Sequence, residues 1–169
     1  MRATDLLLDA FSRVTEEVHH AVEGLSAEQL AARLDGRGNS IAWLVWHLSR
    51  IQDDHVSAVA GTDQVWTAGG WYDRFGLPFE PAATGYGQRF EEVAAVRVGS
   101  GELLTGYYDA VAEATRRYLG QLRDEELTRI VDTRWDPPVT LGVRLVSVIA
   151  DDLEHVGQAA FVRGVLEGR

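Results

Sequence analysis

The chain has 169 residues, of which 46% are hydrophobic and 25% are charged, and its formal net charge is −10. This length predicts a single globular domain over residues 1–169. The negative charge excludes nucleic acid as a partner, because binding along its backbone requires a basic surface. No apolar stretch approaches the roughly 20 residues that span a bilayer. Without a signal-like start as well, we expect no membrane partner and a cytoplasmic location.

The residue types that the chain lacks exclude several kinds of catalysis and metal binding. The chain has no cysteine, and all sixteen of its basic residues are arginine. Disulfides, thiolate metal sites and a nucleophilic thiol are therefore excluded, and so is Schiff-base chemistry on a lysine. Any sulfur chemistry requires a thiol that arrives with a small molecule.

Four long stretches have the apolar period of amphipathic helices, and no stretch has a convincing strand alternation. They cover residues 4–25, 41–60, 102–122 and 141–166. Asn39 or Ser40 is placed to cap the second, Gly61 to end it, and Thr140 to cap the last. The pattern predicts an all-α fold, a four-helix bundle.

Shorter helical pieces are expected between the long ones. A capping-box pattern, Ser26 with Gln29, opens one at 26–34, and others are expected at 91–98 and 124–131.

The connection between the second and third long helices, residues 62–100, is long, irregular and rich in glycine and aromatic residues. A connection of this length is usually functional or packed as a structured loop. Its aromatic residues, with Arg74 and Arg89, could line a substrate pocket or form a lid. Equally, the aromatic residues could simply anchor the connection on the bundle. These aromatic residues are Trp66, Trp71, Tyr72, Phe75 and Tyr86.

Three residues inside the predicted helices form a candidate metal site. Asp151 and His155 are four residues apart and share one face of the last helix, while His47 lies inside the second. Two neutral imidazoles and a carboxylate suit zinc, iron, nickel or manganese. Three protein ligands leave coordination positions open, as a catalytic site requires.

Plainer interpretations of these residues exist. A buried histidine is more often a hydrogen-bonded core residue, and an Asp–His pair at this spacing is often an ion pair. Asp152 and Glu154 are expected on the solvated face, with Asp152 as the weaker alternative ligand. His55 lies about 12 Å beyond His47 along the helix axis and cannot share its ion.

Four segments together carry a specific combination of motifs. They are NSIAWLVWHL at 39–48, GWYDRFG at 70–76, TGYG at 84–87 and HVGQAAFVRG at 155–164. The combination resembles the DinB-like superfamily, and especially its actinobacterial branch of mycothiol S-transferases. The similarity runs along nearly the whole chain.

This resemblance implies a four-helix bundle with a divalent metal, held by a histidine of the second helix and an H-x-x-x-H pair on the last. Carried over residue by residue, the ligands are His47, Asp151 and His155. Aspartate in the middle place departs from the three-histidine form. It is similar to the mycothiol-dependent maleylpyruvate isomerases, in which an acidic residue occupies that place.

The function that the resemblance implies is a metal-dependent thiol S-transferase. Mycothiol, as cosubstrate, would bind to the ion, zinc foremost, and attack an electrophile as a thiolate; the three ligands would act through the metal. Arg50, Asp54 and Arg74 are candidates for binding cofactor or substrate. A metal-dependent hydrolase and a non-catalytic, metal-binding stress-response module stay open as alternatives, and exposed apolar bundle faces favour a homodimer.

Overall fold

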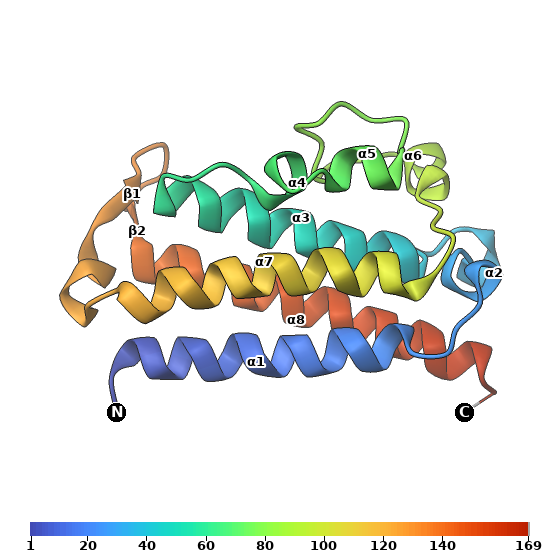
Figure 1. Ribbon diagram of the computed structural model, residues 1–169, viewed down its shortest axis with the longest axis horizontal. Helices are drawn as coiled ribbons and strands as arrows, with labels where there is room; N and C mark the ends of the chain where they lie inside the picture. Colours follow the sequence, from blue (N-terminus) through green and yellow to red (C-terminus); the bar gives the residue numbers. More distant parts are fainter. Residues whose placement is uncertain (169) are drawn as a thin grey trace.

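The fold is built from four long helices, seen in a computed structural model that describes residues 1–168. They are α1 (Ala3–Val22), α3 (Ile41–Ala60), α7 (Gly101–Gln121) and α8 (Leu141–Leu166). Both α1 and α3 pack along α7 and α8, whereas α1 and α3 barely touch each other. In Figure 1, α1 and α8 run in one direction and α3 and α7 in the other, so α3 lies antiparallel to α8. The predicted all-α four-helix bundle is confirmed.

Local signals set the helix boundaries where the sequence predicted them. The Ser40 hydroxyl accepts a hydrogen bond from the Trp43 amide at the start of α3, and Gly61 ends that helix in the left-handed conformation. The Thr140 hydroxyl likewise accepts from the Val143 amide at the start of α8. The capping box of Ser26 opens α2 (Ala27–Leu30). These caps satisfy amides that a helix N-terminus otherwise leaves unpaired.

Two boundaries near the start of the chain differ from the prediction, and the piece expected at 91–98 ends at Ala95. The first helix ends at Val22 rather than 25, because Glu23 leaves the helical region and Gly24 has a positive φ of 73°. The second piece ends at Leu30 and is followed by the 3₁₀ turn η1 (Leu34–Gly36). Between them Arg33 is extended, and its guanidinium donates to the carbonyl oxygens of residues 37, 38 and 90.

The helix predicted over 124–131 is wrong in its second half. A 3₁₀ helix, η2 (Asp124–Thr128), is followed by strand β1 (Ile130–Asp132), which pairs antiparallel with β2 (Val139–Thr140). The expectation of no strand is corrected to this one short hairpin in the part of the chain that the structure describes. Its partner β2 follows two prolines, and this proline-rich turn lets the chain reverse.

The long connection forms three short helices that pack on the bundle: α4 (Val65–Ala68), α5 (Trp71–Phe75) and α6 (Phe90–Ala95). The Trp66 ring is buried, with its centroid 5.0 Å from that of Tyr107 on α7. Tyr72, Phe75 and Trp71 surround the same two rings. These four aromatic residues anchor the connection, while Tyr86 is exposed.

A buried charge pair on α3 fixes the same connection. The Asp53 carboxylate accepts from the amides of Val65 and Trp66 at 2.9 and 2.7 Å, and from the Tyr107 hydroxyl at 2.9 Å. The Arg50 guanidinium donates to the carbonyl oxygens of residues 81 and 83. The start and the middle of the connection are thereby tied to α3. Within the described residues, no helix is both long and apolar enough to cross a membrane.

Candidate metal centre

The packing of α3 against α8 brings the three predicted ligands together. His47, Asp151 and His155 each offer a ligand atom, and these atoms lie within 4.8 Å of one another. His47 is almost fully buried, and the two α8 residues are partly exposed. The convergence follows from the antiparallel pairing, which sets the second turn of α3, where His47 lies, against the middle of α8.

Backbone carbonyl groups fix the tautomers of both histidines. His47 Nδ1 lies 2.6 Å from the Thr84 oxygen, and His155 Nδ1 lies 2.8 Å from the Asp151 main-chain oxygen. A carbonyl oxygen only accepts, so each Nδ1 carries the proton and donates. Each neutral ring is therefore left with an unprotonated Nε2. This is the arrangement by which histidine ligands are usually oriented toward a metal.

The Asp151 carboxylate completes the group. Its Oδ2 atom is buried and has no hydrogen-bond donor, although it lies 3.5 Å from His155 Nδ1. A buried carboxylate oxygen without a donor is costly unless a cation or a proton binds there. Two nitrogen lone pairs and one such oxygen form a donor set that fits a divalent ion.

Burial and aromatic contact shape the His47 side. Its ring stacks on Trp43 with centroids 4.6 Å apart and lies 4.7 Å from the His155 ring. Burial lowers the pKa of His47, and the nearby His155 adds to this, against the opposing effects of the Thr84 hydrogen bond and Asp151. The neutral imidazole that a metal requires is thus favoured.

Gly85 allows the 84–87 segment to approach His47. Its φ is +95°, and a β-carbon there would lie 2.6 Å from His47 Nδ1 and 3.1 Å from the Trp46 ring. Only glycine permits both this conformation and this approach. Because Arg50 binds the carbonyl groups of residues 81 and 83, it holds the chain immediately before the Thr84 carbonyl.

The other predicted site residues are not part of this group. Arg50 is fully buried and engaged with the connection, and its guanidinium lies 3.6 Å from Asp53. Asp54 accepts from the Gln64 amide group at 2.8 Å. Arg74 is exposed and lies over the Trp71 ring, 4.6 Å from its centroid. Their roles in binding cofactor or substrate stay predictions.

One placement was wrong. Asp152, expected on the solvated face, is completely buried and points into the bundle, and both of its carboxylate oxygens lack a donor. Burial raises the pKa of Asp152 well above its usual range, and the neighbouring Asp151 adds to this. Glu154 is exposed as predicted, and His55 is outside the metal group. The contacts of Trp43, Thr84 and Gly85 were missed, although the TGYG motif marked the last two.

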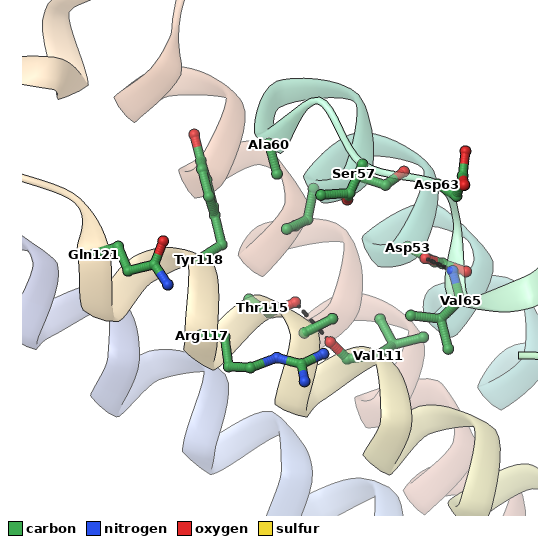
Figure 2. A pocket seen from close by; sticks show the side chains of 13 residues that line it. Asp53, Ser57, Ala60, Asp63, Val65, Val111, Thr115, Arg117, Tyr118 and Gln121 are labelled. Carbon is green, nitrogen blue, oxygen red and sulfur yellow. Dashed lines mark hydrogen bonds between the residues drawn. The ribbon is translucent and has the colours of Figure 1, made fainter. Parts of the chain in front are cut away.

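A separate cavity of about 380 Å³ lies between α3 and α7. Figure 2 shows Ser57 and Ala60 of α3 on one side and Thr115, Tyr118 and Gln121 of α7 on the other. None of the three metal-group residues lines it. The cavity is therefore separate from the candidate centre.

The bundle, with two histidines and an aspartate presented by its second and last long helices, defines a DinB-like protein. The sequence model of the family described as mycothiol-S-transferase matches residues 6–168, so the chain belongs to that family. It is also similar to the crystal structure of a conserved protein from Enterococcus faecalis, with 31% identity and a TM-score of 0.93. That similarity covers 100% of this chain and 99% of the other. A comparison with curated proteins finds no match.

Proposed function

We propose that the protein is a divalent-metal-dependent thiol S-transferase that uses mycothiol, with zinc as the ion. The observation that carries the proposal is the convergence of His47, Asp151 and His155, with two unprotonated Nε2 atoms and an unpartnered Asp151 oxygen. Membership of the mycothiol-S-transferase family supports the choice of thiol.

The chain needs its thiol from outside. It has no cysteine, so the nucleophilic sulfur has to belong to a cosubstrate. A divalent cation at this centre would lower the pKa of a coordinated thiol enough to hold it as a thiolate near neutral pH. The sulfur would then form a bond to the electrophilic carbon while the bond from that carbon to its leaving group breaks. The leaving group would depart with the electron pair of that bond, and the thiol proton would be released to solvent.

Each residue of the centre would have a different role in holding the ion and the thiol. His47 and His155 offer nitrogen lone pairs in directions that the two carbonyl groups fix. Asp151 supplies the one negative charge, so a divalent ion would keep a net positive charge that favours an anionic sulfur. Trp43 shields the buried side of His47 from water.

Metal binding tests the centre directly. Protein freed of metal by a chelator is titrated with Zn²⁺ in a calorimeter, and we expect one site per chain. His47→Ala and Asp151→Asn should abolish it. His55→Ala and Asp54→Asn, which change the same residue types on α3 outside the group, should not. Stoichiometric binding in Asp151→Asn would remove Asp151 from the ligand set.

Activity tests the reaction. Zinc-loaded protein is mixed with mycothiol and a chromogenic electrophile, and formation of the thioether is followed by absorbance. We expect turnover that needs both mycothiol and metal and that His47→Ala lacks. Turnover of an ester without any thiol would instead favour the metal-dependent hydrolase. Bound zinc with neither activity would favour a non-catalytic role.

A further inference from the structure

The outward face of α8 is apolar along almost its whole length. Between residues 143 and 165, Glu154 is the only charged residue at an exposed position. The other exposed residues there are Val143, Val146, Ser147, Ala150, Leu153, Gly157, Gln158, Ala160, Phe161 and Val165. A contiguous apolar face of this kind is typical of an interaction surface.

The same bundle shows what an unpartnered helix face looks like. On α7 most of the exposed positions are charged, with Glu102, Asp109, Glu113, Arg116 and Arg117 among them. The chain as a whole carries a net charge of −10. A charged face is the ordinary state of a helix in water, so the exposed face of α8 differs from that of α7 in a way that calls for an explanation.

The centre of that face has a heptad spacing. Its residues follow one another at alternating steps of three and four: Val143, Val146, Ala150, Leu153, Gly157, Ala160 and Gly164. We call these seven residues the α8 seam. Steps of three and four keep a seam facing a partner helix along the whole contact, as in coiled coils.

The two glycines of the α8 seam have no explanation within the chain. Both lie inside α8, and a β-carbon at Gly157 or Gly164 would meet nothing within 4 Å. Glycine weakens a helix interior relative to alanine. Their small size therefore serves a contact that comes from outside the chain.

The distribution of side-chain size along the seam favours a second copy of the same chain. The branched residues Val143 and Val146 lie in its first half, and Gly157, Ala160 and Gly164 fill its second half. An antiparallel pair related by a two-fold axis sets the large half of each copy against the small half of the other. A parallel pair would set large against large and leave the glycines facing each other.

The length of the face also fits a dimer. From Val143 to Val165 the helix rises about 33 Å. A stable interface buries on the order of 800 Å² from each partner, and a helix face of this length with its flanking residues is of that order. We propose that a second copy packs on the α8 seam through its own α8, in antiparallel orientation. This proposal does not rest on the proposed function.

Analytical ultracentrifugation of the purified chain tests the proposal. We expect a dimer at micromolar concentration, and Leu153→Glu should raise its dissociation constant by at least about tenfold. The matched control is Leu6→Glu on α1, since Leu6 and Leu153 are both about half exposed, at 58% and 45%. A wild-type chain that stays monomeric, or a Leu153→Glu dimer as tight as wild type, would overturn the proposal.

A second variant separates loss of the dimer from loss of the fold. Gly157→Leu should improve helix propensity, because its side chain meets open space within the chain. In the dimer the same side chain would collide with the partner helix near Ala150 and Leu153, which lie opposite Gly157 when the two-fold axis passes near Leu153. We expect a monomer whose melting temperature is no lower than that of monomeric Leu153→Glu. A dimer of unchanged affinity contradicts the proposal.

Single cysteines report the orientation, because the chain has none of its own. In the antiparallel pair, Leu153→Cys lies near the two-fold axis and should cross-link between copies on mild oxidation. Val143→Cys lies at one end and should not cross-link alone, but should do so when mixed with Gly164→Cys. Efficient cross-linking of Val143→Cys with itself would indicate a parallel pair and overturn the arrangement.

Discussion

Two buried polar clusters on the same helix differ in how completely they are satisfied. Toward α7 and the long connection, the Asp53 oxygens accept from two backbone amides and the Tyr107 hydroxyl, with Arg50 at 3.6 Å. Toward α8, His47 meets His155 and Asp151, and the Asp151 Oδ2 atom has no donor. In the first cluster every Asp53 oxygen has a donor, whereas the second offers ligand atoms that lie within 4.8 Å of one another.

The difference separates a structural cluster from a candidate ligand site. A buried polar group stabilises a fold when every partner is present, and it costs free energy when one is missing. Asp53 is thus a structural residue that fixes the connection to α3. The His47 group has the character of a site whose last partner is an ion. The two clusters should therefore respond oppositely to mutation and to metal.

The largest effect on stability is expected from Asp53→Ala. It leaves two buried amides and the Arg50 charge without their acceptor, so we expect a loss of about 3–5 kcal/mol in the free energy of unfolding. Urea unfolding measures this, and added Zn²⁺ should not restore the difference. A loss below about 1 kcal/mol would mean that the Asp53 cluster does not stabilise the attachment of the connection to α3.

The opposite response is expected from His47→Ala. Removing one ligand should weaken Zn²⁺ binding by more than about 100-fold, since even changes to residues around a metal site cost 10–100-fold. Zn²⁺ should raise the melting temperature of wild type but not of this variant. Calorimetry and thermal melts follow both. An equal rise in both proteins would place the ion elsewhere.

Gly85→Ala tests the contact that orients His47. The new β-carbon would meet His47 Nδ1 and require a positive φ, so we expect a loss of about 1–3 kcal/mol in stability and at least about tenfold in metal affinity. The matched control is Gly87→Ala, which also has a positive φ, +71°, but meets nothing within 4 Å. If both variants lose metal affinity equally, contact with His47 is not the cause.

The bundle and the shared face of Asp151 and His155 could be predicted for a physical reason, whereas the inclusion of His47 depended on the logic of a bundle and on the resemblance of the motifs around it. Caps such as Ser40 and Gly61 act locally, and the four-residue spacing of Asp151 and His155 determines a shared face. The Thr84 carbonyl could not be found in this way, because every residue has one. Only the packed connection determines which carbonyl reaches His47.

The error at Asp152 has a specific cause. Asp152 lies four residues from both Val148 and Val156, on the face of α8 that is buried. The helical period therefore marks position 152 as buried. The expectation of a solvated side chain followed its residue type, because an aspartate is almost never fully buried unless it is paired.

The smallest effect is expected from pH. Burial is the main cause that lowers the pKa of His47 and of His55 below the usual value of about 6.5. The unfolded chain then binds more protons than the folded chain between the lowered and the usual pKa. Stability of the metal-free protein is therefore present above pH 6.5 and is lost as the pH falls through that window.

The difference between wild type and His47→Phe isolates this effect, because the carboxyl groups, which include Asp53 with its raised pKa, are common to both proteins. Urea unfolding at several pH values between 5 and 8 should show a shallower loss in the variant, with a difference of at most about 1.4 kcal/mol per unit of pH. Saturating Zn²⁺ should steepen the loss in wild type, because protons and metal compete for the same Nε2 atom. If the free energy of unfolding follows pH equally in the two proteins, with and without metal, then protonation of His47 does not affect stability. The contrast between the two clusters would then not hold.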